Sequence, residues 1–173
     1  MSEASRNIKT PWNPSKKAIQ RVKNPLPTPV VCPRCGGKVA IVENKEIYGK
    51  NYGEWPWTFR CESSDCDSFV GMHPYTNIPL GTLATAEIRN ARKLTKELFQ
   101  KLWLGDGAPM TRTEAYQWLA VALEVPAEEC HFGWFNIETC RRAYSILRDR
   151  LNKEHQEDDT MRHNSYCKSQ LEK

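Results

Sequence analysis

Apolar and polar positions follow two different patterns along the chain. Between residues 31 and 80, the apolar residues come in short runs at 38–42, 55–59 and 68–70 that are rich in β-branched and aromatic side chains. Glycines lie between the first two runs, where a hairpin has to turn. Short runs of this composition, bounded by turn residues, predict a small antiparallel β module over residues 31–80.

Between residues 81 and 151, apolar residues recur instead at three- and four-residue steps, which predicts helices. Helices are expected over 83–103 (capped by Thr82), 112–124 (opened by a Thr111–Glu114 capping box) and 137–151 (capped by Asn136). The expected inward-facing positions are Ala84, Ile88, Ala91, Leu94, Leu98 and Leu102, then Ala115, Tyr116, Trp118, Leu119, Ala122 and Leu123, and finally Cys140, Ala143, Tyr144, Leu147 and Leu151. Residues 81–151 are therefore expected to form a three-helix unit.

Neither of these two patterns continues into the ends of the chain. Residues 1–30 hold five prolines among polar residues, which predicts a flexible basic arm, and residues 152–173 predict a disordered polar tail. Trp12 is the exception in the arm, and we expect it to fold back on the module or to dock on a partner. No apolar run is long enough for a membrane helix and no secretory leader is visible, so a cytoplasmic protein is expected.

The positive charge of the chain is concentrated near its start. The net charge is +4 over 173 residues, and residues 1–31 alone carry +5. Such a segment favours an acidic partner, either nucleic acid or an acidic protein surface. The alternative that it is only a solvated leader, which keeps the protein soluble, stays open.

Four of the seven cysteines form two close pairs, Cys32/Cys35 and Cys61/Cys66. The two-residue spacer and the glycines that follow Cys35 are typical of a zinc knuckle, in which two thiolates converge on one ion at about 2.3 Å. Four protein ligands leave no open position, so the predicted cofactor is one structural Zn²⁺. The predicted fold is α+β, with an N-terminal four-cysteine zinc ribbon packed on a C-terminal three-helix unit.

Other arrangements of the ligands remain possible from the sequence. The four-residue spacer between Cys61 and Cys66 is longer than the usual two, and His73 could replace one cysteine. Cys130, His131 and Cys140 could belong to a second metal site, although packing of the two cysteines as small hydrophobes is favoured. A redox role for the first pair would need a helix start, and a strand follows it instead.

Several strings of residues together resemble a family of small bacteriophage and prophage proteins described as a zinc-finger-containing domain of unknown function. The matching strings are residues 32–37, Ile47-Tyr48-Gly49 with Tyr52-Gly53, 69–74, 79–84, 112–120, 130–133 and 138–142. The resemblance covers about residues 31–145 and implies zinc and a phage-type origin, but no activity. The long spacer before Cys66 departs from the family's pattern.

A mixture of aromatic and basic residues lies between the two cysteine pairs. Cations neutralise phosphates and rings stack on unpaired bases, so this mixture is typical of nucleic-acid surfaces. The predicted contacts with nucleic acid or another partner are Lys50, Tyr52, Arg60, Lys16, Lys17 and Arg21. The alternative is that the rings only cover a module with little other core.

The three helices also invite comparison with a helix-turn-helix motif. The 125–136 connection is too long for the short turn of that motif, and a solvated face is favoured for the basic residues of these helices.

No Walker loop, nucleophile elbow or paired-carboxylate pattern is found. The sequence therefore predicts a non-enzymatic accessory protein that binds nucleic acid or a host complex that handles it, with no membrane and no small-molecule substrate. The alternative is an inhibitor or adaptor that binds a host enzyme or a defence factor.

Overall fold

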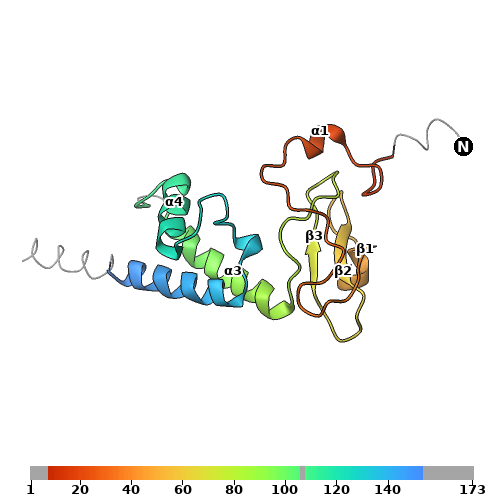
Figure 1. The fold of residues 1–173 in the computed structure, drawn as a ribbon. Helices are drawn as coiled ribbons and strands as arrows, with labels where there is room; N and C mark the ends of the chain where they lie inside the picture. Colours follow the sequence, from red (N-terminus) through yellow and green to blue (C-terminus); the bar gives the residue numbers. More distant parts are fainter. Residues whose placement is uncertain (1–7, 106–107, 154–173) are drawn as a thin grey trace, which may run out of the picture. The chain divides into compact units, whose positions relative to one another are not determined.

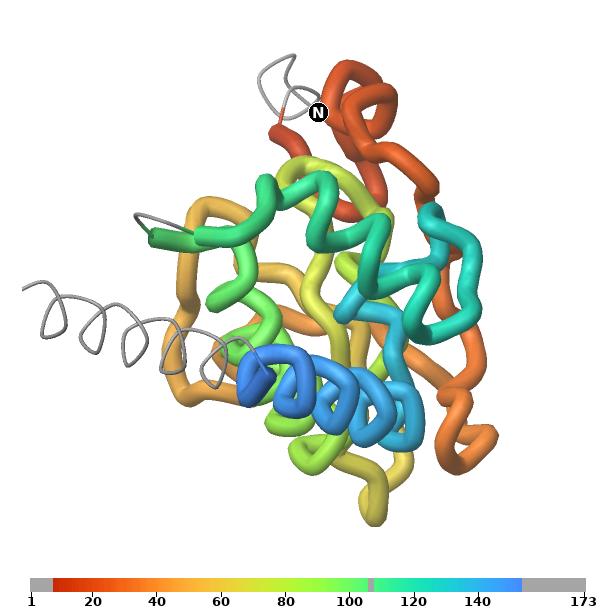
Figure 2. The backbone as a smooth tube through the Cα atoms, turned by 90° about the vertical axis from the view of Figure 1, so that its left-hand side faces the viewer, coloured from red at the N-terminus to blue at the C-terminus, as the bar shows by residue number. Residues whose placement is uncertain are grey.

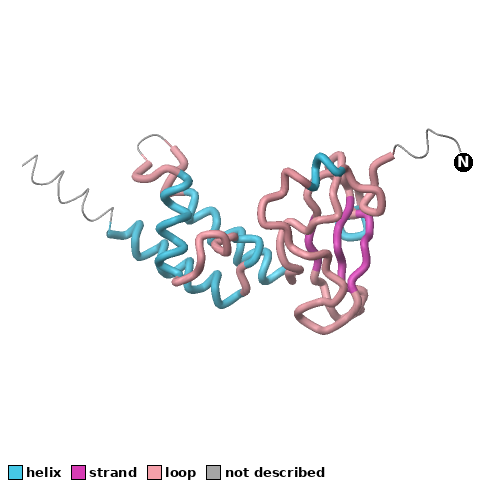
Figure 3. The backbone as a smooth tube through the Cα atoms, turned by 45° about the horizontal axis from the view of Figure 1, so that its top comes forward, coloured by secondary structure: helices cyan, strands magenta, loops and turns pink. Residues whose placement is uncertain are grey.

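A computed structural model of the chain describes residues 8–105 and 108–153, and the chain divides into two compact units after Asn90. The elements are α1 (Lys16–Ile19), β1 (Val39–Glu43), α2 (Lys45–Tyr48), β2 (Trp57–Cys61), β3 (Phe69–Gly71), α3 (Ala86–Gln100), α4 (Arg112–Leu123), the 3₁₀ turn η2 (Phe132–Trp134) and a helix over residues 137–153. The three strands lie in the first unit, and most of the helical residues lie in the second (Figures 1 and 3). The predicted α+β class is confirmed.

The three strands form one antiparallel sheet in the order β1-β2-β3. Phe59 in the centre lies opposite Ile41 on β1 and Val70 on β3. Because side chains alternate along a strand, Phe59 and Cys61 point to the same face, while Arg60 points to the other. Phe59 and Cys61 are 1% and 2% exposed. The face that carries the core of this unit therefore also carries one of the four paired cysteines.

The predicted start of the first long helix is wrong. Ala84 pairs with Phe69 in an isolated β-bridge, with both N–O distances 3.2 Å. Thr85 then ends the extended stretch, because its hydroxyl accepts from the Ile88 amide at 3.4 Å and its carbonyl accepts from the Arg89 amide at 2.9 Å. The helix consequently begins at Ala86 rather than at residue 83, because the backbone of Ala84 is hydrogen-bonded to β3.

The buried face of α3 also differs from the predicted stripe. Leu94 is 57% exposed, whereas Thr95 and Phe99 are 2% and 1% exposed. Thr95 can be buried because its hydroxyl donates to the Ala91 carbonyl at 2.7 Å. The Phe99 ring contacts the rings of Tyr116 and Phe132, with centroids 4.7 and 5.1 Å away. An aromatic cluster therefore selects the face of α3 that packs inward.

The other two helices of the second unit start where the sequence predicts. The Thr111–Glu114 capping box is complete, and the Asn136 side chain accepts from the Thr139 amide at 2.8 Å. The helix over 137–153 (blue in Figure 2) packs against α3, whose Thr95 hydroxyl donates to the Cys140 carbonyl at 3.4 Å. Among the described residues, the hydrophobic core of this unit consists of Phe99, Leu102, Ala115, Leu119, Ala120, Leu123, Cys130, Phe132, Phe135, Cys140, Ala143 and Leu147. Tyr144, predicted to face inward, is 44% exposed.

The N-terminal segment, for which the sequence predicts an arm, contacts the rest of the first unit at several points. The Trp12 ring meets Trp57 edge-on, with centroids 5.2 Å apart, so this residue folds back on the module. The Ser15 amide donates to the Tyr75 carbonyl at 2.9 Å, at the start of α1 (red in Figure 1). Neither α1 nor α2 was predicted.

Residues 1–7 of the predicted arm and residues 154–173 of the predicted tail lie outside the described residues, while residues 152 and 153 continue the last helix. Within the described part of the chain, no helix combines the length and the apolar character that crossing a lipid bilayer requires.

Candidate metal centre

The first cysteine pair lies on a closed loop over residues 32–37. The Cys32 amide donates to the Gly37 carbonyl at 2.8 Å, and the Gly36 amide donates back to the Cys32 carbonyl at 2.9 Å. Gly36 has φ +72°, a left-handed conformation that glycine adopts without the steric penalty of a Cβ. The two hydrogen bonds turn the backbone so that Cys32 and Cys35 present their sulfurs to the same point.

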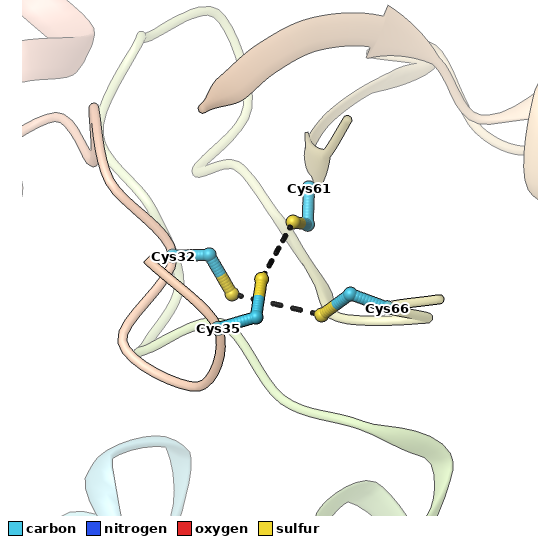
Figure 4. Close-up of side chains that lie close together, drawn as sticks. All are labelled: Cys32, Cys35, Cys61 and Cys66. Carbon is cyan, nitrogen blue, oxygen red and sulfur yellow. Dashed lines mark hydrogen bonds between the residues drawn. The ribbon is translucent and has the colours of Figure 1, made fainter. Parts of the chain in front are cut away.

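The second pair lies at the end of β2 and in the turn that follows. Cys61 is the last residue of the strand, and its amide donates to the Ser68 carbonyl at 2.9 Å. The Cys66 amide donates to the Ser63 carbonyl at 3.1 Å. This turn brings Cys66 back toward Cys61, so the four-residue spacer is compatible with a shared ligand site (Figure 4).

All four sulfurs converge on one point. Their Sγ atoms lie within 4.8 Å of one another, with 3.4 Å between Cys35 and Cys61 and 3.8 Å between Cys32 and Cys66 (Figure 4). A tetrahedral ion with sulfurs at about 2.3 Å would hold them about 3.8 Å apart. Disulfide bonding would require about 2.0 Å, so these distances match a shared metal ion. Three of the ligands are buried and Cys35 is exposed.

The thiols of Cys35 and Cys61 have pKa values shifted in opposite directions. The pKa of Cys35 is lowered to about 6, first by the Gly37 amide 3.4 Å away and then by the Ser63 hydroxyl. The pKa of Cys61 is raised to about 11, because burial and the neighbouring Cys35 sulfur outweigh the lowering effect of the Ser63 amide. A divalent ion deprotonates coordinating thiols and so removes this conflict between neighbours.

Small residues surround the sulfurs. A Cβ at Gly37 would lie 3.2 Å from Cys35 Sγ and 3.2 Å from Cys61 Sγ, and closer still to Ser63 Oγ. The Ser63 and Ser68 hydroxyls lie 3.6 Å from Cys35 Sγ and 3.3 Å from Cys66 Sγ, within reach to donate to thiolates. The sequence analysis missed both serines, because serine is common in any turn and no spacing rule identifies it.

The other candidate ligands lie elsewhere. Within residues 8–105 and 108–153, the group of potential ligands that the structure gathers is the four cysteines, and it does not include His73. Cys130 and Cys140 belong to the core of the second unit, where burial raises the pKa of both thiols. Their packing as small hydrophobes is confirmed. His131 is exposed and stacks on Trp134 at 5.5 Å.

The six predicted partner contacts fall into two groups. The first surrounds α2: Lys50 Nζ lies 5.1 Å from the centroid of the half-exposed Tyr52 ring, and Arg60 forms an ion pair with Glu46 at 3.7 Å. The second group, which is exposed and lies in the N-terminal segment, consists of Lys16, Lys17 and Arg21. That segment contacts Trp57, whose side chain leaves β2 on the face opposite to that of Arg60.

A small antiparallel sheet with two cysteine pairs that converge on one closed site is the arrangement of a zinc-binding module. The chain belongs to a family described as a zinc-finger-containing domain, whose match covers residues 28–150. The comparison with curated proteins gave no match, and neither did the comparison with solved structures. Cys32, Cys35, Cys61 and Cys66 hold one structural zinc ion. With four protein ligands, this ion has no position left for a substrate.

Proposed function

We propose that the chain is a non-enzymatic accessory protein that binds nucleic acid through its N-terminal segment, with the zinc ribbon as the support. This proposal is supported by one observation: a basic segment is fixed to the ribbon by contacts at two of its residues. Residues 8–23 contain five basic residues and no acidic one. The contacts of Trp12 with Trp57 and of Ser15 with Tyr75 hold this run of charge against the ribbon.

A row of exposed cations on a folded support attracts phosphates and releases their counterions on binding. Lys16 and Lys17 are exposed on α1, and Arg21 is exposed just beyond it. Arg60 is less suited to this role because Glu46 offsets its charge. The proposed interface therefore lies mainly on the N-terminal segment, with Lys50 and Tyr52 near α2 as a second, separate contact.

The test is the salt dependence of binding. Fluorescence anisotropy with labelled oligonucleotides should show an affinity that falls steeply between 50 and 200 mM salt, as expected when phosphate contacts release counterions. Replacing Lys16, Lys17 and Arg21 by Ala should weaken binding and flatten the slope by about 0.7–0.9 per lost contact. Replacing three exposed lysines of the second unit by Ala (Lys93 and Lys96 of α3, and Lys101 just beyond it) removes the same charge and should have little effect. An affinity indifferent to salt would reject the proposal.

The second candidate function is that of an inhibitor or adaptor that binds a host enzyme or a defence factor. A groove of about 420 Å³ on the second unit favours it, because Leu94, Ile137 and Tyr144 line that groove and Leu94 is 57% exposed. Pull-down of partners before and after nuclease treatment separates the two functions. Partners that survive nuclease support the adaptor, and partners that disappear support nucleic acid.

The proposed setting is the cytoplasm of a bacterial host, with the gene carried by a phage or prophage. This part of the proposal is supported by the resemblance of the ribbon and helix motifs to phage proteins. Detection of the chain in the soluble fraction of infected or induced cells would test it.

A further inference from the structure

Two pairs of aromatic rings include the two tryptophans of the Trp55-Pro56-Trp57 stretch at the start of β2. Trp12 meets Trp57 edge-on at 5.2 Å, and Tyr75 lies tilted against Trp55 at 5.4 Å. We call Trp12, Trp55, Trp57 and Tyr75 the aromatic platform. Trp12 and Tyr75 are its exposed members, at 66% and 40%.

Trp12 is exposed although its backbone is well anchored. It occupies the tip of a turn in which the Asn13 amide donates to the Thr10 carbonyl at 2.9 Å and Pro11 is buried. The Asn13 side chain also donates to the Ile8 carbonyl at 3.0 Å. A large ring on a fixed turn loses little conformational freedom when it stacks on a ligand, so its exposure suits recognition.

Tyr75 is held in a conformation that aromatic residues rarely adopt. Its φ is +61°, in the left-handed region, where a bulky residue without compensating contacts is strained. Three contacts hold it there. The Ser15 amide donates to the Tyr75 carbonyl, and the Tyr75 hydroxyl donates to the Glu54 carboxylate at 2.8 Å. The Tyr75 ring also packs against the Trp55 ring. Strain of this kind is concentrated at functional sites.

Exposed cations follow directly in the chain after a residue that contacts the platform. Ser15, whose amide binds the Tyr75 carbonyl, is directly followed by Lys16 and Lys17. We propose that the aromatic platform stacks the unpaired bases of a single-stranded nucleic acid while Lys16 and Lys17 neutralise its phosphates, an inference that rests on the proposed function. Aromatic faces stack on any unpaired base, whereas a duplex keeps its bases inside its own stack.

The experiment compares a single strand with a duplex on the zinc-loaded full chain. A labelled 20-mer of thymidine, a 20-mer of uridine and a 20-base-pair duplex are titrated at low salt. We expect the single strands to bind at least tenfold tighter than the duplex. Trp12→Ala should weaken single-strand binding about tenfold and leave duplex binding unchanged, and Trp12→Phe should restore most of the loss. Trp134→Ala removes an indole ring of the second unit that belongs neither to the aromatic platform nor to the N-terminal segment, and should change neither affinity.

Three outcomes are decisive. Tighter single-strand binding that depends on the Trp12 ring supports the inference. Equal, salt-dependent binding of single strand and duplex, or single-strand binding indifferent to Trp12→Ala in a variant with full zinc content, overturns the inference and leaves the proposed function standing. Absence of salt-dependent binding to all three probes overturns both.

Discussion

Gly37 lies where a single methyl group would disturb the metal site. An added Cβ would be 3.2 Å from two ligand sulfurs and closer still to Ser63 Oγ. We therefore expect Gly37→Ala to weaken zinc binding about ten- to a hundredfold, the usual cost of disturbing the surroundings of a metal ligand. Competition with a chromophoric chelator measures this affinity.

Further variants make the Gly37 prediction specific. Adding Ser63→Ala removes the nearest obstacle, so the double variant should bind zinc no worse than Ser63→Ala alone, in which only the hydroxyl near Cys35 Sγ is lost. Ser64→Ala, on the exposed part of the same turn, should leave the affinity unchanged. Wild-type affinity in Gly37→Ala would show that the loop relaxes around the added carbon.

At the residue scale, the four ligands could be predicted because cysteine spacing reports directly on metal geometry. The residues around them could not. Ser63 and Ser68 contact the sulfurs only because a turn and a strand register bring them there. Likewise, nothing in the local sequence of Tyr75 indicates its positive φ, since that conformation depends on contacts with Ser15 and Glu54, which lie far away in the chain.

The two faces of α3 should respond very differently to substitution. Phe99 is 1% exposed and lies in an aromatic cluster, so Phe99→Ala should cost about 3–5 kcal/mol of unfolding free energy. Leu94 is 57% exposed, so Leu94→Ala should change it by less than about 0.5 kcal/mol. Urea unfolding followed at 222 nm measures both. Equal losses of unfolding free energy in the two variants would show that Leu94 faces inward, as the periodicity predicted.

The capping box of α4 should add stability that acid removes. Glu114 accepts from the Thr111 amide and hydroxyl, both at 2.7 Å, and these bonds lower its pKa below 4.5. A lowered pKa contributes stability that is complete above 4.5 and is lost as the pH falls through the folded-state value. Glu114→Ala should therefore unfold at lower urea than the wild type at pH 7.

Urea unfolding of both proteins at a series of pH values checks the origin of that effect. The difference between wild type and Glu114→Ala should narrow as the pH falls below 4.5, because the protonated carboxyl binds the amide less well. Glu128→Ala removes an exposed carboxylate from a turn and should show no comparable dependence. A difference that is constant with pH would assign the loss to helix propensity instead.

At the element scale, caps and periodicity predicted where α4 and the last helix begin, because those patterns are local. They failed at α3. Ala84 fits a helical stripe, but its backbone pairs with Phe69 in the sheet, and this pairing depends on a residue 15 positions away. Thr95 was not counted as apolar, yet a hydrogen bond to Ala91 allows its burial. A contact between distant segments decided the first case, and a hydrogen bond within the helix itself allowed the second.

At the scale of the whole molecule, the two units are stabilised by different means. The first has a small core around Phe59 and the zinc ligands, with Met72 and Leu83. In the part of the chain that the structure describes, the second has a hydrophobic core of twelve residues, none of which is a zinc ligand. A structural zinc contributes apparent binding free energy of about 10–16 kcal/mol in zinc-finger peptides. The stability of the first unit should therefore depend on the metal, and that of the second on apolar burial.

Zinc removal tests this division. After treatment with a strong chelator, the amides of β1, β2 and β3 should lose protection in hydrogen exchange followed by mass spectrometry, because the four thiols then no longer hold the ribbon together. The amides of α4 and of the helix over 137–153 should stay protected, since Phe99, Leu119 and Leu147 remain buried without the ion. Added zinc should restore the strands. Loss of protection in both units at the same chelator concentration would show that the ribbon and the helices unfold as one cooperative structure.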